Sequence, residues 1–368
     1  MRCKSISQKL YIVNFPLFFL KKFQMSPIQA EISAWYLAHK RPLPWRETQN
    51  PYFIWLSEII LQQTRVDQGM AYYFKFVQAF PTVFELANAD EQSVLNLWQG
   101  LGYYSRARNL HATAKQVVSE FHGKFPDTYE GLLSLKGVGP YTAAAIASFS
   151  FDLPHAVLDG NVFRVLSRLY NWSVPINSTQ GKKDFEKMAQ ELLDKNNPGL
   201  FNQAMMEFGA LHCKPTQPNC DNCPVQLYCQ AYAAQTVDQV PVKLKKQGVR
   251  NRYFLFELVQ ASPDSILLEK RSEKDIWQHL YQFPLKEFAD DASKQAYMTA
   301  LSPAFQSKEY KHILSHQHLY CHFVTRDLHA SDTAERISIL AFDQYPIPRV
   351  IERFLEDYGL DIFESQAR

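Results

Sequence analysis

Four cysteines clustered within seventeen residues constrain this chain more than any other feature. They are spaced as Cys213-x6-Cys220-x2-Cys223-x5-Cys229, and prolines bend the chain between them. Four thiolates placed in this way can surround a single compact centre. Structural zinc sites usually pair two Cys-x2-Cys-like knuckles across a longer gap, whereas one knuckle flanked by two lone cysteines suits a [4Fe–4S] cluster. The sequence therefore predicts a [4Fe–4S] cluster, with zinc as the alternative.

Length and composition exclude several classes of protein. The chain has 368 residues, 46% hydrophobic and 21% charged, which excludes collagen-like and wholly disordered chains and predicts two or three domains. A net charge of +2 excludes a histone-like protein but allows a local basic face. Because clustered free cysteines favour a reducing compartment, we expect a cytoplasmic protein.

The first 24 residues form a separate segment. The apolar run from Leu10 to Leu20 is too short to span a bilayer, and Lys21 and Lys22 stand where a signal peptide would have its cleavage site. We therefore interpret residues 1–24 as an extension before a start at Met25, either disordered or not translated. No other stretch is expected to cross a membrane.

The remaining chain divides by its hydrophobic pattern. Residues 25–230 show helical periodicity broken by Gly and Pro, 231–248 form a polar and basic linker, and 249–368 contain short β-like runs. The runs are Tyr253–Val259, Ser265–Leu268 and Leu319–Thr325, with a final helix from about Pro348 to Tyr358. The pattern predicts a mainly α front domain and a smaller α+β rear domain.

A glycine hairpin lies between two expected helices, at Leu135-Lys136-Gly137-Val138-Gly139-Pro140-Tyr141. Gly137 and Gly139 would let the backbone approach a DNA phosphate, and the free N–H groups of the second helix would face the anion. An ordinary helix–helix turn is the alternative. Since no strand precedes the glycines, a dinucleotide-binding fold is not expected.

Two carboxylates lie in contrasting surroundings. Asn50 and Pro51 begin the expected helix PYFIWLSEIILQQTRV, which is apolar around most of its circumference and leaves Glu58 and Gln62 on one polar strip. Burial should raise the pKa of Glu58, as a general acid requires, although a paired structural glutamate is the alternative.

Asp159 precedes another helix, whose N-terminus is expected to keep this carboxylate ionised at neutral pH. An ordinary N-cap is the alternative interpretation. One protonated and one ionised acid is the division of labour used in glycosidic bond cleavage.

Several motifs together resemble the MutY family of adenine DNA glycosylases, within the endonuclease III or helix-hairpin-helix superfamily. They are WLSEIILQQTRV, GLGYYSRARNL, KGVGPYTAAAI, VLDGNVFRVLSR and the cysteine spacing. The resemblance implies a six-helix barrel with an iron–sulfur helical module, followed by an α+β Nudix-like domain. It also implies base-excision repair by a monomer on the nucleoid, hydrolysing the N-glycosidic bond of adenine mispaired with 8-oxoguanine or guanine in double-stranded DNA.

By position, the resemblance implies that Glu58 protonates adenine and Asp159 stabilises the oxocarbenium-like sugar, with Tyr141 and Asn161 supporting them. Bifunctional relatives carry a Lys where this chain has Tyr141, and Tyr cannot form a Schiff base, so a monofunctional enzyme is expected. The alternatives are a bifunctional endonuclease III-type glycosylase and lyase acting on damaged pyrimidines, and an iron–sulfur DNA-binding protein without catalysis.

The resemblance also implies which residues contact a nucleotide flipped out of the duplex. Positions that line the adenine pocket are Leu43, Trp45, Arg46, Leu61 and Gln203. Positions that wedge the duplex and meet the opposite base are Gln63, Thr64, Leu101 and Tyr103. Leu61 and Leu101 could instead belong to the core.

The rear domain resembles a Nudix fold adapted to binding. The run from Trp277 to Pro284 is Nudix-like, but no Arg-Glu-x-x-Glu-Glu box follows it, so the carboxylates that hold a catalytic metal are missing. The family reads 8-oxoguanine through Phe-Ser-His, and this chain has Leu314-Ser315-His316. Ser315 and His316 are expected to make polar contacts with the lesion.

Overall fold

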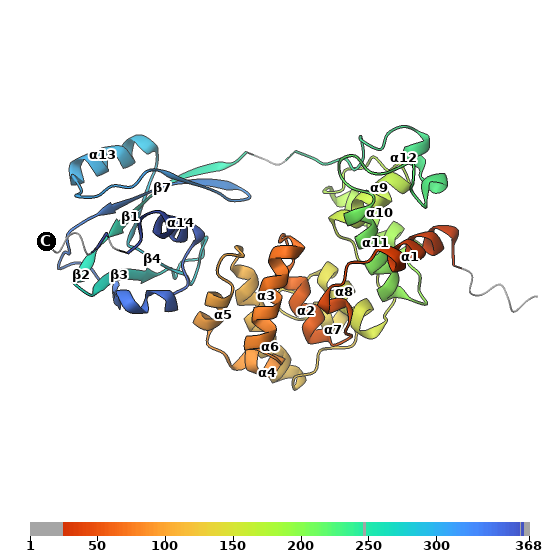
Figure 1. Ribbon diagram of the computed structural model, residues 1–368, viewed down its shortest axis with the longest axis horizontal. Helices are drawn as coiled ribbons and strands as arrows, with labels where there is room; N and C mark the ends of the chain where they lie inside the picture. Colours follow the sequence, from red (N-terminus) through yellow and green to blue (C-terminus); the bar gives the residue numbers. More distant parts are fainter. Residues whose placement is uncertain (1–24, 246–247, 361, 364–368) are drawn as a thin grey trace, which may run out of the picture.

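The computed structural model describes residues 25–245, 248–360 and 362–363, so the prediction for the extension 1–24 lies outside the described residues. The helices of the front part lie between Pro27 and Ala233, and the strands, with further helices among them, begin at Arg250 (Figure 1). This arrangement confirms the predicted class, a mainly α front part and an α+β rear part, while the exact domain boundaries stay predictions. In the described part of the chain, no helix has the length and apolarity to cross a membrane.

The front part consists of short helices joined by tight turns. Their bounds are α1 Pro27–His39, η2 Pro44–Arg46, α2 Pro51–Ile60, α3 Val66–Ala79, α4 Val83–Asn88, α5 Glu91–Leu97, α6 Ser105–Phe121, α7 Tyr129–Leu133, α8 Pro140–Phe151, α9 Gly160–Leu169, α10 Thr179–Leu192, α11 Pro198–Leu211, η3 Gln226–Tyr228 and α12 Gln230–Ala233. Local chemistry places the starts: the Asn50 side chain accepts a hydrogen bond from the Tyr52 backbone N–H, and Pro51 occupies the first turn of α2, as predicted.

Helix α2 is shorter than the sequence pattern predicts. It ends at Ile60, and Gln63 adopts a left-handed conformation with φ 56°. Gln62 therefore lies beyond the helix, where its amide donates to Thr142 Oγ1 at 3.4 Å. The predicted polar strip shared by Glu58 and Gln62 on one helix face is wrong for this reason.

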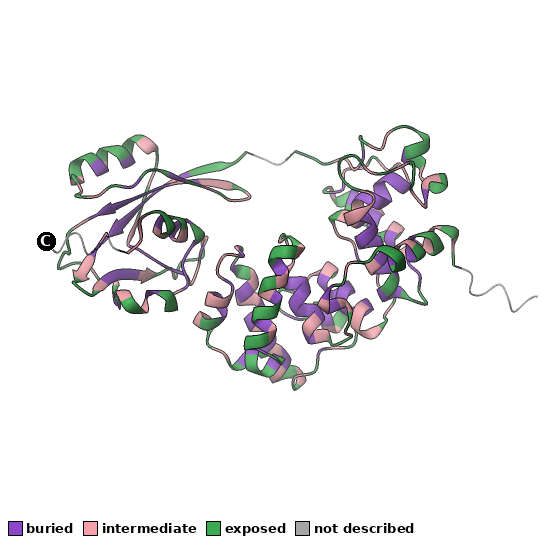
Figure 2. Cartoon of the chain, in the orientation of Figure 1, coloured by how far each residue is buried: buried purple, intermediate pink, exposed green. Residues whose placement is uncertain are grey.

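The front part contains two large hydrophobic cores and a small third cluster, formed by Ala144, Ala145 and Val157; Figure 2 shows buried residues along the helices. One core joins α2 to α8, and the other joins α1, α9, α10 and α11. Helix α11 packs against both α8 and α9. At Gly209 a Cβ would lie 2.6 Å from the Asn161 side chain, so the absence of a side chain allows α11 to approach the start of α9 closely.

The rear part consists of two sheets and two helices. Its elements are β1 Arg250–Leu258, β2 Gln260–Ser262, β3 Ser265–Lys270, β4 Tyr281–Gln282, β5 Leu285–Phe288, α13 Asp291–Leu301, β6 Tyr310–Ile313, β7 Gln317–Thr325, β8 Glu335–Ser338, η4 Ile339–Gln344 and α14 Arg349–Tyr358. One sheet has the order β5-β1-β7-β6, with β1 and β7 parallel; the other has the order β2-β3-β4, with β8 also paired to β3. Helix α14 packs on the first sheet through Phe354, which stacks on Phe323.

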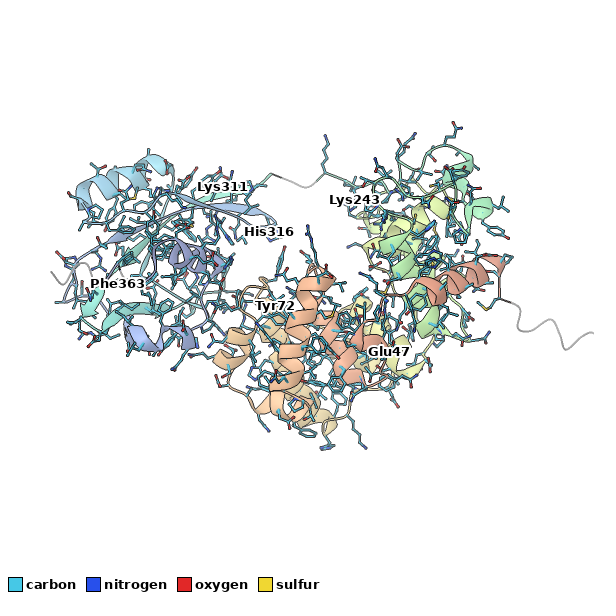
Figure 3. The ribbon with its side chains drawn as sticks, viewed as in Figure 1. Glu47, Tyr72, Lys243, Lys311, His316 and Phe363 are labelled. Carbon is cyan, nitrogen blue, oxygen red and sulfur yellow. The ribbon has the colours of Figure 1, made fainter. Side chains whose placement is uncertain are left out.

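The two parts touch along α5 and α6 of the helical part. The amides of Gln92 and Asn96 both donate to the Gln344 carbonyl at 2.6 Å, and His279 Nδ1 lies 2.6 Å from a Glu91 carboxylate oxygen. The hairpin between β6 and β7 carries His316 at its tip (Figure 3). The rear part is therefore held beside the α5–α6 side of the front part.

Candidate active site

A cavity of about 210 Å³ lies where the two helical cores meet. It is lined by all of the predicted catalytic residues and all of the predicted adenine-pocket residues, together with Thr64. These are Glu58, Tyr141, Asp159, Asn161, Leu43, Trp45, Arg46, Leu61 and Gln203. Because they come from η2, α2, α8, α9 and α11 and their flanking residues, only the tertiary fold brings them together. Leu61 also packs against the core, so both of its interpretations apply.

Glu58 lies in the last turn of α2 with only 7% of its surface exposed. The pKa of its carboxyl is raised to about 7, chiefly by burial and also by the nearby Asp159 charge, against the lowering effect of a hydrogen bond from Tyr141 and the charge of Arg46. Glu58 can therefore carry its proton near neutral pH, as predicted for a general acid.

Tyr141 lies in the first turn of α8, directly after Pro140. Its hydroxyl donates to Glu58 Oε2 at 2.7 Å. Burial raises the pKa of Tyr141 well above its usual range, and the Glu58 and Asp159 charges add to this effect. The phenol therefore keeps its proton and remains a donor to Glu58.

Asp159 caps the N-terminus of α9, as the alternative interpretation has it, and it also lines the cavity, so its catalytic role stays a prediction that this position allows. Its Oδ1 accepts the backbone N–H groups of Asn161 and Val162 at 2.8 and 2.7 Å, and its Oδ2 accepts Asn161 Nδ2 at 2.8 Å. Burial nevertheless raises the pKa of Asp159 above its ordinary value. Desolvation thus outweighs these three donors in setting the direction of the shift, and ionisation of Asp159 at neutral pH stays a prediction.

Asn161 is held from the other side by Arg164. One Arg164 nitrogen donates to Asn161 Oδ1 at 2.9 Å, and Arg164 Nε donates to the Cys213 carbonyl at 2.7 Å. Asn161 thus has a fixed orientation, with its amide nitrogen toward Asp159. The start of α9 is rigidly connected to the chain segment where the cysteines begin.

Sequence reasoning missed an ionic network along one wall of the cavity. Glu207 accepts from Arg41 at 2.6 Å and from Arg46 at 2.8 Å, and its side chain is 1% exposed. Although burial raises the pKa of Glu207, hydrogen bonds from the two arginines lower it to about 2. The available signal was spacing, since Glu207 follows Gln203 by four residues and must share its helix face. Tyr36 also contributes, donating to Gln203 Oε1 at 2.6 Å.

A second cavity, of about 320 Å³, lies between the front and rear parts. It is lined by four residues predicted to meet the opposite base, namely Leu101, Tyr103, Ser315 and His316, and by Leu314. The Tyr103 hydroxyl and Ser315 Oγ are 2.5 Å apart. Leu101 is 8% exposed and packs in the core as well. Gln63 lines neither of these two cavities, while Thr64 lines the first one.

The predicted helix–hairpin–helix is formed by α7, the glycine turn and α8. Gly137 has φ 76° and fits against Asn109, where a Cβ would lie 2.7 Å from the asparagine side chain. Gly139 caps α8, and a Cβ built there would meet nothing within 4 Å. The backbone at Gly139 is therefore open to a ligand, and the phosphate contact of Gly137 and Gly139 stays a prediction.

The four clustered cysteines line one small cavity of about 30 Å³ beside α9 and α11. All four are free thiols. Arg168 donates to Cys213 Sγ at 3.3 Å, and burial raises the pKa of Cys223 to about 12. Within the described ranges, no three His, Cys, Asp or Glu side chains converge closely enough to hold one ion.

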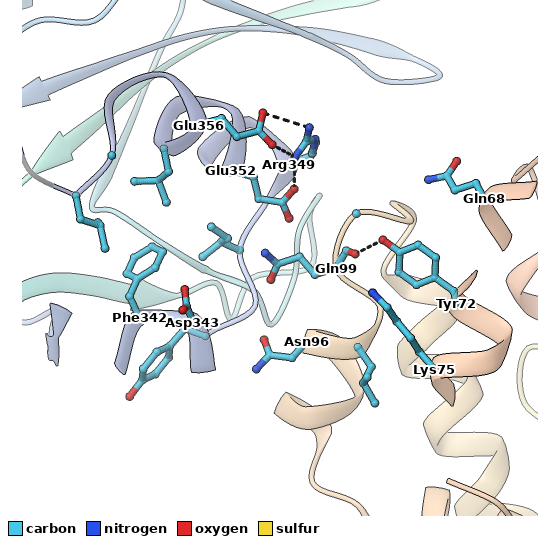
Figure 4. A pocket seen from close by; sticks show the side chains of 17 residues that line it. Gln68, Tyr72, Lys75, Asn96, Gln99, Phe342, Asp343, Arg349, Glu352 and Glu356 are labelled. Atoms are coloured by element: carbon cyan, nitrogen blue, oxygen red, sulfur yellow. Dashed lines mark hydrogen bonds and ion pairs between the residues drawn. The ribbon is translucent and has the colours of Figure 1, made fainter. Parts of the chain in front are cut away.

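A larger cavity, about 1200 Å³, lies between α3, α5 and α14 (Figure 4). Arg349 pairs there with Glu352 and Glu356, each at 2.7 Å, and the Tyr72 hydroxyl donates to the Gln99 carbonyl at 2.5 Å. It contains none of the residues predicted to be functional. Size alone therefore does not identify the active site of this chain.

Known proteins match both parts of the chain. Residues 56–195 match the HhH-GPD superfamily of base excision DNA repair proteins, and residues 256–357 match the NUDIX domain. The adenine DNA glycosylase of Buchnera aphidicola subsp. Baizongia pistaciae is 38% identical over 283 residues, covering 76% of this chain and 80% of that protein. The human adenine DNA glycosylase is 42% identical over 225 residues, covering 59% of this chain and 41% of the human protein.

A solved structure of a thermostable thymine-DNA glycosylase has a TM-score of 0.53 and 27% identity. It covers 56% of this chain and 95% of that protein. The match shows the helical fold, and the Buchnera relative covers both the helical and part of the rear region. The chain therefore belongs to the MutY family of adenine DNA glycosylases, the base-excision repair hydrolases of the HhH-GPD superfamily that bind DNA and release adenine from it.

Proposed function

We propose that this chain releases adenine paired with 8-oxoguanine or guanine in double-stranded DNA and leaves the DNA strand uncut. The observation that carries the chemistry is the presence of Glu58 and Asp159 in one cavity, with a pKa of about 7 for Glu58. Such a pair provides a proton for the leaving base and a negative charge for the sugar.

The hydrogen bonds of Glu58 indicate how it would act. Since Oε2 accepts from Tyr141, the proton of the acid form resides on Oε1, which is free to meet a ring nitrogen of adenine. Proton transfer turns adenine into a better leaving group. The resulting carboxylate is stabilised by Tyr141 and by the charge of Arg46 and can then accept a proton from the attacking water.

Asp159 would stabilise the positive charge that develops on the sugar. Three hydrogen bonds from Asn161 and Val162 fix its carboxylate in position before the substrate arrives. Such preorganisation costs no rearrangement during the reaction, and a buried site strengthens the attraction between opposite charges. The same geometry serves either electrostatic stabilisation or formation of a covalent bond to the sugar.

The lining of the cavity supports a monofunctional enzyme. None of the described residues that line it is a lysine, and Tyr141 supplies a hydroxyl where a Schiff-base reaction would need an amine. A bifunctional glycosylase and lyase is therefore disfavoured.

The second cavity supports recognition of the base opposite adenine. Tyr103 from the front part and Ser315 and His316 from the rear part face it together, so the opposite base would be read by both parts at once. Polar side chains there can bond to the carbonyl and N–H groups that distinguish 8-oxoguanine and guanine from pyrimidines. We also propose that the chain acts as a monomer on the DNA of the nucleoid, in the cytoplasm.

We also propose that Cys213, Cys220, Cys223 and Cys229 hold a [4Fe–4S] cluster. The four thiols share one cavity with apolar side chains, and their spacing, one Cys-x2-Cys knuckle flanked by two lone cysteines, suits a four-iron cluster better than a zinc site. A basic neighbour, Arg168, would offset the negative charge of four thiolates. Such a cluster would close the segment between α11 and α12 into a compact loop. Its role would be architectural, because the hydrolysis itself transfers no electron.

The direct test uses duplexes with labelled adenine opposite 8-oxoguanine, guanine or thymine. We expect alkali-dependent strand breaks, fastest opposite 8-oxoguanine, and no breaks without alkali. Glu58→Gln should bind the mismatch but release no adenine. Equal rates opposite all three bases would refute the proposed specificity, and breaks without alkali would favour the lyase alternative.

A further inference from the structure

Arg106, in the first turn of α6, makes contacts that neither the catalytic mechanism nor the predicted site includes. Its guanidinium reaches two separate turns of the chain. Nη1 donates to the carbonyls of Ile59 and Ile60, at 3.0 and 3.1 Å, and to the carbonyl of Gln62. Nη2 donates to the carbonyls of Leu101 and Gly102, at 3.4 and 3.2 Å.

Two of these five acceptors, one in each turn, directly precede a residue with a left-handed backbone. Gln62 precedes Gln63, with φ 56°, and Gly102 precedes Tyr103, with φ 49°. Residues other than glycine adopt this conformation rarely, at a cost of order 1–3 kcal/mol, and keep it only where the surroundings enforce it. One guanidinium thus contacts the carbonyl in front of both strained residues.

The charge of Arg106 is balanced by backbone groups. Among the described residues no carboxylate forms an ion pair with it, and its Nε has no hydrogen-bond partner. Ile59 and Ile60 belong to the last turn of α2, where carbonyls lack partners within the helix and carry partial negative charge. Burial lowers the pKa of Arg106 only to about 10, so it stays charged at neutral pH.

The two turns lead to the two cavities. The turn after α2 follows Glu58 within a few residues, and Leu61 and Thr64 line the cavity that contains this acid. The other turn carries Leu101 and Tyr103, which line the cavity between the front and rear parts. The rings of Trp98 and Tyr103 also lie 5.0 and 5.6 Å from the guanidinium.

We propose that Arg106 is a positioning residue that couples recognition of the opposite base to adenine release. This inference rests on the proposed specificity. A base that displaces Tyr103 moves the Gly102 carbonyl, and the planar guanidinium transmits this movement to the carbonyls at the end of the helix that carries Glu58. Lysine at this position would keep the charge but lose the rigid fork that spans both turns.

The test is the ratio of single-turnover rates of adenine release opposite 8-oxoguanine and opposite thymine. In Arg106→Lys we expect this ratio to fall by about tenfold or more, since the lost bonds are to a charged group. A merely structural loss would lower both rates together and leave the ratio unchanged. A ratio within about twofold of the wild-type value would overturn the proposal.

The matched control is Arg326→Lys, which alters an arginine of the rear part whose guanidinium also bonds two separate segments, there through the carboxylates of Glu257 and Asp332. Arg326 follows the last residue of β7, whereas Ser315 lies before the first residue of this strand. Arg326→Lys should keep the wild-type ratio at an equal loss in melting temperature. If the ratio of the two rates also falls in the control, general destabilisation explains the effect and the proposal fails.

Two further outcomes are distinguishable. If the wild type itself shows no preference for 8-oxoguanine, the proposed specificity fails, whatever Arg106 does. If Arg106→Lys does not fold, Arg106→Gln, which retains an amide donor, takes its place in the same ratio measurement. Failure of both variants to fold would make Arg106 a structural residue and overturn the coupling role.

Discussion

The hydrogen bond between Tyr141 and Glu58 gives a sharp prediction for the pH dependence of adenine release. The Tyr141 hydroxyl donates to Glu58 Oε2 at 2.7 Å and holds down the pKa of Glu58, which burial nevertheless keeps raised, at about 7. Glu58 acts in its protonated form, so the rate should fall as the pH rises through this pKa. Tyr141→Phe removes the donor and leaves the ring in place.

The size of the effect follows from the kind of bond that is lost. A hydrogen bond to a charged group contributes about 1.5–3 kcal/mol, which corresponds to about one to two pKa units. The ionised form of Glu58 loses this stabilisation, so its pKa rises. We therefore expect the alkaline limb of the rate profile to move from near 7 to about 8–9 in Tyr141→Phe.

Single-turnover release of adenine between acidic and alkaline pH would measure this limb. Tyr52→Phe is the matched control, because Tyr52 lies on the same helix as Glu58 but donates to the Phe80 carbonyl. The control should keep the limb near that of the wild type. A limb that stays in place in Tyr141→Phe, or moves to lower pH, would show that Glu58 is not the titrating acid.

Three other predictions test stability, the cysteine site and the second cavity. Glu58→Gln should stabilise the protein at pH 8 by up to about 3 kcal/mol, because folding raises the pKa of this carboxyl from 4.5 to about 7 and so penalises its ionised form. The gain should vanish below pH 4.5, and thermal unfolding measured at both pH values would contradict the prediction if the variant were less stable at pH 8. Cys220→Ala should lose the visible absorbance expected of an iron–sulfur protein, whereas a colourless, zinc-containing wild type would refute the cluster. Tyr103→Phe, which loses the bond to Ser315, should lower the preference for 8-oxoguanine by about threefold to tenfold while melting within a few degrees of the wild type, and an unchanged preference would remove this hydroxyl from recognition.

The features that sequence reasoning predicted correctly are those decided by local chemistry. The start of α2 depends on Asn50 and Pro51, which lie beside it in the chain. The burial of Glu58 follows from the apolar residues around it on one helix. The family's motifs predicted which residues line the first cavity, although these residues come from segments far apart in the sequence.

The features that were missed depend on contacts between distant segments. Helix α2 ends early because its last carbonyls bond to Arg106 of α6, which no pattern within α2 could indicate. The wall formed by Arg41, Arg46 and Glu207 joins residues more than 160 positions apart. Charges that neutralise each other across such a separation leave no local signal in a sequence.

Asp159 shows how the two acids of the active site come to differ. Both carboxyls have a raised pKa because both are buried, so burial cannot be what separates them. The number of donors does separate them: Asp159 accepts three hydrogen bonds, and Glu58 accepts one in the part of the chain that the structure describes. Each donor favours the charged form, so Asp159 ionises first, and its charge then raises the pKa of Glu58. The division of labour is therefore set by hydrogen bonding within a shared low-dielectric cavity. Removing donors from Asp159 should raise the pKa of Asp159 and, as its charge is lost, lower the pKa of Glu58.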